Sequence, residues 1–113
     1  MTTAVVPSWA KMRTEETRRV EEVLRSAGFR QVDAYRYNSA SIRVRVVDPQ
    51  FEGLPVEKRD ALIEPHLISL PERTQADIMA LFSFSPGELE ESSPRVRTLL
   101  MNAEFDDPSP SRL

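Results

Sequence analysis

The 113-residue sequence contains no cysteine and only one histidine, His66. Without a thiol the chain has no disulfide, no thiolate nucleophile and no thiolate metal ligand, which also suits a reducing compartment. A single histidine beside Pro65, with no second ligand close to it, is typical of a surface or partly packed side chain. We therefore predict that the chain holds no metal and no other cofactor.

Long hydrophobic runs are also absent. No segment approaches the roughly 18 apolar residues of a membrane-spanning helix, and the N-terminus lacks the basic start and apolar block of a secretory signal. We expect a soluble, cytoplasmic protein that makes no membrane contact. A chain of this length with 40% hydrophobic residues suits one small domain.

Signatures of catalysis are missing as well. The sequence has no Walker loop, no HExxH motif and no Ser/His/Asp set. Asp60 and Glu64 lie at i and i+4 of an expected helix, close enough in principle to share a proton, but such charge runs usually face solvent. We predict that the chain is not an enzyme.

Helical spacing is clear over residues 14–27, where apolar positions repeat at i, i+3, i+4 and i+7 from Val20. Acidic residues crowd the first turn, and Gly28 follows the last periodic residue as a left-handed stop. An amphipathic helix is therefore expected. Before it, we treat residues 1–7 as a loose arm and expect an extra turn that lays Trp9 on the domain.

Two strands are expected next, over residues 29–37 and 41–48, because the first is rich in aromatic and β-branched side chains and the second alternates. The pair should form an antiparallel hairpin that ends at Pro49, since proline cannot donate to a sheet ladder. In the second strand one face carries Ile42, Val44 and Val46, and the other carries Arg43, Arg45 and Val47.

The chain then turns at Gly53 into a second helix, which is expected to kink or stop at Pro65. Residues 78–84 are mostly apolar on both faces. This pattern predicts a strand that is buried on both sides and central in the sheet.

A capping box that begins at Ser85 predicts a short helix, and Ser93-Pro94 repeats the signal. An apolar stripe from Val96 to Leu100 indicates a C-terminal helix. Residues 103–113 are acidic and proline-rich, which predicts a flexible tail. The expected organisation is a single α/β domain over residues 8–102 between the arm and the tail.

Four short motifs resemble the second half of the BolA family: a Phe-x-Gly turn, a helix opened by valine, an Ala-Leu pair in a strand and a Pro-x-Glu helix start. They are Phe51-Glu52-Gly53, Val56 to Ile63, Met79-Ala80-Leu81 and Pro86-Gly87-Glu88, and the resemblance spans residues 14–91. It implies a fold related to the type II KH domain, in the order α-β-β-α-β-α. A small three-stranded mixed sheet with helices packed on one face is expected.

The resemblance also implies which chemistry is lost. BolA-like proteins pair with monothiol glutaredoxins and help to hold a [2Fe-2S] cluster through a histidine or cysteine. Where the family pattern has histidines, this sequence has Arg59 and Met79. Arginine offers only donors and methionine only a weak thioether, so a non-enzymatic adaptor or regulatory module without iron–sulfur ligation is expected.

Candidate contacts with a partner protein lie on the second helix, near it and in the C-terminal segment. Arg59 is expected to bind a partner's carboxylate. Phe105 is a lone aromatic among acids, typical of a short motif that orders on binding, unless it folds over the domain's own core or the tail is disordered. The candidates are Phe51, Gly53, Lys58, Arg59, Met79 and Phe105.

A second hypothesis is a divergent KH-like protein that binds nucleic acid on an arginine and tyrosine face of the sheet. The candidate residues are Arg30, Arg36, Tyr37, Arg43 and Arg45, beside Tyr35. Against it stand the formal net charge of -3 and the lack of a Gly-x-x-Gly loop. The simpler interpretation is that Arg43 and Arg45 form the solvated face of an outer strand.

A homodimer is a further hypothesis, because a small sheet with an exposed edge often pairs with a copy of itself. The first strand is the expected edge. If Phe29, Tyr35 and Tyr37 were exposed there, they would form an apolar interface.

Overall fold

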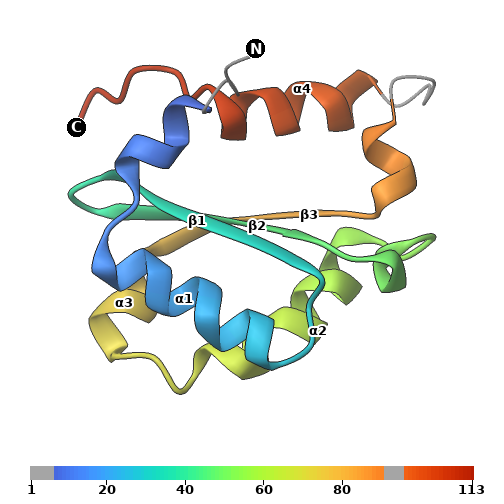
Figure 1. Cartoon of the computed structure of the whole chain (residues 1–113), viewed down its shortest axis with the longest axis horizontal. Coiled ribbons are helices and arrows are strands. Elements are labelled where there is room, and N and C mark those ends of the chain that lie inside the picture. The colour runs from blue at the N-terminus through green and yellow to red at the C-terminus, as the bar shows by residue number, and fades with distance from the viewer. Residues whose placement is uncertain (1–6, 91–95) are drawn as a thin grey trace, which may run out of the picture.

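The structure is a computed structural model that describes residues 7–90 and 96–113. The order helix, strand, strand, helix, strand, helix is confirmed, with short additional helices between these elements (Figure 1). The strands are β1 (Gln31–Asn38), β2 (Ser41–Val47) and β3 (Ile78–Phe84). The α-helices are α1 (Glu15–Ser26), α2 (Val56–Leu67), α3 (Glu72–Asp77) and α4 (Val96–Asp106), and the 3₁₀ helices are η1 (Ser8–Met12), η2 (Pro49–Phe51) and η3 (Pro86–Leu89).

The sheet is mixed, and β2 is its central strand. β1 pairs antiparallel with β2, and β2 pairs parallel with β3. The prediction that residues 78–84 form the central strand is wrong, because β3 lies at an edge. Its side chains are apolar on both sides because helices cover both faces of the sheet, which buries an edge strand as well as a central one.

Helices lie on both faces of the sheet, whereas one covered face was expected. α1, α2 and α3 cover one face, and η1 and α4 cover the other (Figure 1). The alternation predicted for β2 is confirmed, since Ile42, Val44 and Val46 belong to the core beneath α1 and α2. Arg43, Arg45 and Val47 therefore face α4.

Aromatic rings fill the second core, between the sheet and α4. Phe105 is fully buried, with its ring centroid 4.8 Å from Tyr35, 5.3 Å from Phe82 and 5.5 Å from Trp9. Trp9 is 5% exposed and is placed there by η1, as expected from the sequence. Phe105 is thus an internal anchor that holds α4 on the sheet.

The C-terminal segment begins later than expected. α4 continues to Asp106, so the prediction of a tail from residue 103 is wrong. Beyond the helix, Tyr37 Oη donates to the Ser109 carbonyl at 2.7 Å, and Asn38 Nδ2 donates to Ser111 Oγ at 3.0 Å. The segment after α4 therefore lies against the β1–β2 hairpin. The expected arm, apart from Pro7, and the expected helix start at Ser93-Pro94 lie outside the described residues.

Local signals explain the ends of the helices. Thr14 and Thr17 form a reciprocal capping box at the start of α1, and Gly28 follows that helix with φ of 103°. Of the two outcomes expected at Pro65, a kink or a stop, the stop is wrong, because α2 continues through the proline to Leu67. His66 is exposed, as predicted, with its ring edge-on to Phe29. No helix within the described residues is long and apolar enough to cross a membrane.

Replacing Phe105 tests its role as an internal anchor. Phe105→Ala should lower the free energy of unfolding by about 3–5 kcal/mol, because it leaves a cavity among three other aromatic rings. Urea unfolding followed by Trp9 fluorescence measures the change. Leu100→Ala is the matched control on the same helix, since Leu100 is 64% exposed and its truncation should cost less than about 0.5 kcal/mol. Equal effects of the two changes would contradict the anchor.

Candidate functional site

The six predicted partner-binding residues separate into a buried and an exposed group. Phe51, Arg59 and Phe105 are between 0% and 5% exposed, so none of them offers its side chain to a partner. Lys58 and Met79 are exposed, and Met79 is 69% exposed at the start of β3. The structure therefore brings the predicted set together only in part.

Arg59 is a buried clamp between α2, β3 and η3. Its guanidinium forms a two-pronged ion pair with Glu88, with nitrogen–oxygen distances of 2.7 and 3.1 Å. Nε also donates to the Leu54 carbonyl at 2.8 Å, and Nη1 donates to the Ser83 carbonyl at 2.9 Å. All three nitrogens are engaged within the fold. The expectation that Arg59 binds a partner's carboxylate is therefore wrong, because Glu88 of the same chain supplies that carboxylate.

Phe51 and Gly53 also serve the fold rather than a surface. The Phe51 ring lies 6.0 Å from that of Phe29 in the main core. Gly53 has φ of 76°, a conformation that favours glycine, and it turns the chain from η2 toward α2. Nearby, Ser85 Oγ donates to the Glu52 carboxylate, which ties this turn to the end of β3.

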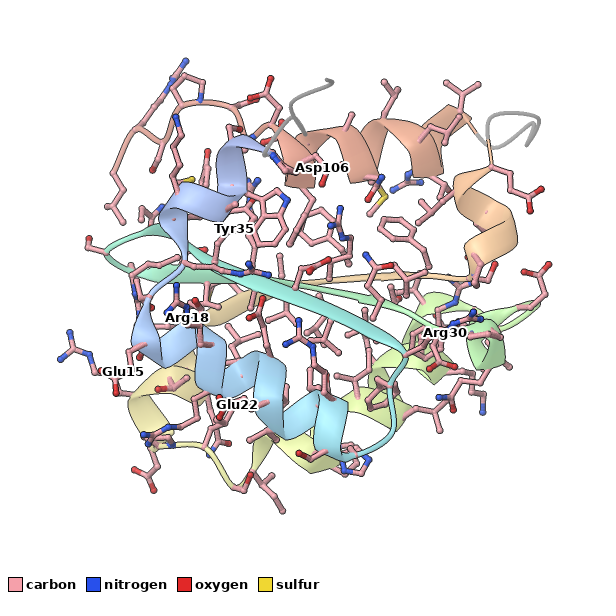
Figure 2. All side chains as sticks on the ribbon, in the orientation of Figure 1. Glu15, Arg18, Glu22, Arg30, Tyr35 and Asp106 are labelled. Carbon is pink, nitrogen blue, oxygen red and sulfur yellow. The ribbon has the colours of Figure 1, made fainter. Side chains whose placement is uncertain are left out.

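The arginine and tyrosine face predicted for nucleic acid is covered by α4. Arg45 is 6% exposed and forms ion pairs with Asp33 at 2.7 Å and Asp106 at 2.6 Å. Tyr35 lies between the sheet and α4, and its burial raises the pKa of its phenol (Figure 2). Neither an open stacking platform nor a solvated strand face is present at these positions. The apolar interface that exposed Phe29 and Tyr35 would have formed on the first strand is not present, since Phe29 is buried in the core beneath α1 and α2 and Tyr35 beneath α4.

The charge of Arg43 is also balanced by an acid of the same chain, in the layer between the sheet and α4. Its guanidinium carbon lies 3.7 Å from the centroid of the Tyr37 ring, and Nη1 lies 3.2 Å from Glu104 Oε1. Arg30 is exposed at the start of β1, away from these two residues (Figure 2). The predicted nucleic-acid set is therefore dispersed, and three of its arginines, counting Arg36, are engaged by acids of the same chain.

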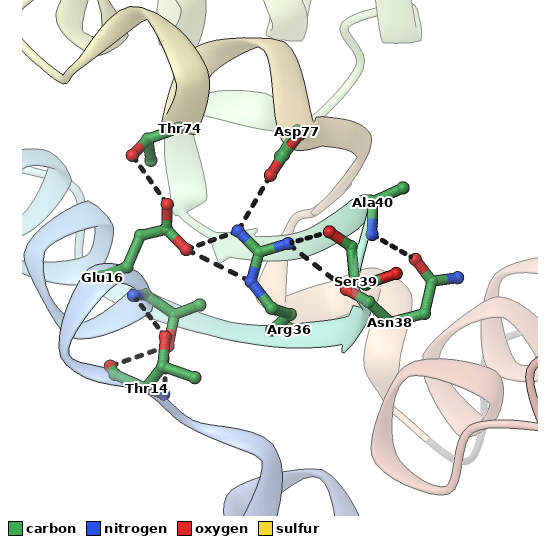
Figure 3. A network of polar contacts seen from close by, with 9 residues as sticks. Thr14, Glu16, Arg36, Asn38, Ser39, Ala40, Thr74 and Asp77 are labelled. Atoms are coloured by element: carbon green, nitrogen blue, oxygen red, sulfur yellow. Dashed lines mark hydrogen bonds and ion pairs between the residues drawn. The ribbon is translucent and has the colours of Figure 1, made fainter. Parts of the chain in front are cut away.

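Arg36, near the end of β1, is the centre of a polar network that joins this strand to α1 and α3 (Figure 3). It pairs with Glu16 of α1 and with Asp77 at 2.9 Å, and it donates to the Asn38 and Ser39 carbonyls. The hydrogen bond from Arg36 lowers the pKa of Glu16 below its ordinary value, against the opposing effect of burial. Since the arginine joins α1, α3 and the hairpin, we interpret this network as structural.

A groove with both polar and apolar lining residues lies beside α2 and the edge of β3. It has a volume of 290 Å³ and is lined by Glu64, Leu67, Ile68, Gln75, Ile78 and Leu81. Ile68 is 75% exposed there, more than any other large apolar residue in the described chain. An exposed apolar side chain beside a groove is of the kind that marks an interaction surface.

An acidic row borders this groove on α2. Glu57, Asp60 and Glu64 follow one another at helical spacing, on the flank of α2 that continues to Ile68. Burial raises the pKa of Asp60, and the neighbouring charges of Glu64 and Glu57 raise it further. Asp60 Oδ1 is buried and makes no hydrogen bond. The row thus carries a negative charge that is poorly balanced within the fold.

The comparisons give no family assignment. No family model matches the chain, and no curated protein matches it. The BolA-like resemblance therefore rests on the motifs and their order. Among residues 7–90 and 96–113, no three His, Asp or Glu side chains lie close enough together to hold a metal ion.

Sequence reasoning missed Ile68, Glu64 and Leu81 as members of the candidate surface. A signal for Ile68 was present, because the buried stripe of α2 follows Arg59, Ile63 and Leu67 at steps of four residues, and Ile68 falls outside it. An apolar residue beside the stripe indicates an exposed position. Leu81 had no such signal, because its exposure depends on β3 being an edge strand.

Replacing Arg59 tests the clamp. Arg59→Met should lower the free energy of unfolding by about 3 kcal/mol or more, because it removes the charge that balances buried Glu88 and two donors to buried carbonyls. Urea unfolding at neutral pH measures the loss. Lys58→Met is the control, because Lys58 is the exposed neighbour on the same turn. If the two changes cost the same, Arg59 does not clamp α2 to β3.

Asp60 predicts a specific pH dependence. Because its folded-state pKa is raised above the ordinary value of 3.8, ionisation destabilises the folded state as the pH rises through that range, and the penalty is complete at neutral pH. Asp60→Asn should therefore raise the urea midpoint at neutral pH and leave it unchanged below about 3.8. Glu22→Gln, on the exposed side of α1, controls for net charge. An equal gain from both variants at both pH values would refute the assignment.

Proposed function

We propose that this chain is a non-enzymatic, BolA-like protein-interaction module that has lost iron–sulfur ligation. The observation that carries the proposal is Ile68, which is 75% exposed in the groove between α2 and β3. The groove lies beside a row of carboxylates and an edge of β3 with which no strand of the described residues pairs. An apolar surface rimmed by polar groups is typical of a site for another protein. We expect the module to be soluble and to act in the cytoplasm.

The donor chemistry at the family's ligand positions supports the loss of the cluster. Iron–sulfur clusters are held by thiolates or imidazoles. Arg59 presents no lone pair and is bound to Glu88, while Met79 offers only a thioether on the surface. The residues present do not fit the cluster.

The covered arginine face favours a protein partner over nucleic acid. Arg43 and Arg45 lie beneath α4 and pair with Glu104, Asp33 and Asp106. A phosphate backbone needs basic side chains that are free to exchange their counterions. Here the counterions are carboxylates of the same chain.

A tagged full-length chain, used as bait at low and moderate salt with and without nuclease, tests this function. We expect a discrete partner that resists nuclease, is identified by mass spectrometry, and is lost with Ile68→Glu but kept with Leu100→Glu, an exposed position on α4. Loss of all bound material on nuclease treatment would favour the KH-like alternative. A visible absorbance band from a bound cluster would contradict the loss of iron–sulfur ligation.

A further inference from the structure

We propose that the open edge of β3, together with the acidic flank of α2, binds a basic extended peptide segment as a fourth strand. This inference rests on the proposed function, for which it names the site and the class of partner. Adding a strand satisfies backbone groups that an edge leaves unpaired, and adjacent pockets select the side chains.

The two edges of the sheet differ. α1 packs along β1 (Figure 1), and two of its side chains bond the backbone of that strand. Glu21 accepts a hydrogen bond from the Ala34 amide at 2.9 Å, and Arg25 donates to the Val32 carbonyl at 2.9 Å. An incoming strand therefore finds two outward backbone groups in the middle of β1 already bonded.

The edge of β3 is open at Leu81. The Phe84 carbonyl accepts from the Asp48 amide that follows β2, so the backbone groups of Phe84 face β2. Because these groups alternate along a strand, those of Leu81 and Ser83 face outward. The Ser83 carbonyl already accepts a hydrogen bond from Arg59. Within the described residues, no side chain bonds the backbone of Leu81 and no strand pairs with β3 on this side.

The groove beside this edge accepts an apolar side chain. α2 runs antiparallel to β3, since Arg59 reaches Ser83 near the end of the strand and Ile68 shares the groove with Ile78 at its start. Leu81 forms part of the same groove. A strand paired with Leu81 would thus lay alternate side chains against α2.

The charge of that flank selects a basic segment. Asp60 and Glu64 are four residues apart on α2, about 6 Å along the helix axis. Side chains on one face of a strand repeat at about 6.6 Å, so two alternate lysines or arginines match the two carboxylates. Glu64 is exposed and Asp60 is half-buried, so lysine or arginine side chains can approach this flank from solvent.

A second copy of the chain fits this edge poorly. Pairing β3 with the β3 of a copy across a twofold axis would set the two α2 helices side by side. Glu57, Asp60 and Glu64 of one copy would then approach the same acids of the other. Like charges at such an interface oppose association, so the occupant we infer is a basic segment of another protein.

The test uses the isotope-labelled full-length chain and a short, end-capped peptide that alternates lysine and valine, titrated by NMR. We expect binding that weakens with salt, shifts in Leu81 and Glu64, and slowed hydrogen exchange of the Leu81 amide. The same peptide with glutamate for lysine should bind at least about tenfold more weakly, as should the double variant Asp60→Asn/Glu64→Gln with the lysine peptide. Glu15→Gln/Glu22→Gln, at two exposed positions of α1, removes the same number of charges and should bind as the parent chain does.

Leu81→Pro tests strand pairing separately from charge. It removes the outward amide but no bond to β2, so a folded variant, checked by circular dichroism, should lose the peptide. Equal affinity for the two peptides, or undiminished binding by Leu81→Pro, would overturn the inference. A concentration-dependent dimer that Leu81→Pro dissolves would instead identify a second copy as the occupant and overturn it as well. If a natural partner is captured but is indifferent to Leu81→Pro and to the charge variant, the proposed function stands and this site fails.

Discussion

The buried arginine on the central strand is the constraint around which the fold is arranged. Arg45 lies at 6% exposure in the middle of the sheet, and a charge there is tolerated only when carboxylates neutralise it. Asp33 comes from the neighbouring strand and Asp106 from the last turn of α4. Since Phe105 precedes Asp106, its ring packs in the same place, and its centroid lies 4.3 Å from the Arg45 guanidinium. The ion pair of Arg45 with Asp106 and the apolar packing of Phe105 thus both hold α4 on the sheet.

Arg59 has the corresponding role in the other half of the molecule. Its ion pair with Glu88 and its bonds to the Leu54 and Ser83 carbonyls join α2 to the end of β3. This clamp keeps α2 alongside the strand edge and so maintains the groove with its acidic border. Arg59 therefore has a structural role in positioning α2 against the sheet.

These two arginines determine which surfaces remain for a partner. The arginine face of β2 is used to hold α4, and two backbone groups at the edge of β1 are bonded by Glu21 and Arg25 of α1. Within the described residues, the side of β3 next to α2 keeps an edge with no paired strand, an exposed Ile68 and carboxylates with little compensating charge. A site assembled from an edge strand, a helix flank and a groove suits an extended peptide better than a small molecule.

Hydrophobic periodicity was enough to predict α1, the hairpin, the two faces of β2 and the order of the elements, because each of these depends on short-range spacing. The same pattern misplaced β3 at the centre of the sheet. Burial of both faces of a strand says nothing about which strands pair beside it, and the helix on the second face was needed to explain the apolar Phe82 and Phe84.

For the candidate site, the residue types alone identified Arg59, Met79 and Phe105 as unusual, but they did not distinguish surface from interior. Arg59 and Phe105 are interior because partners distant in the sequence, Glu88 for one and Trp9 with Tyr35 for the other, meet them only in the folded chain. Composition by itself determined that the chain has no thiol chemistry, because it contains no cysteine, and that it has only one imidazole, that of its single histidine. Tertiary structure decided which charges are neutralised within the fold and which stay exposed, because that depends on contacts between residues far apart in the chain.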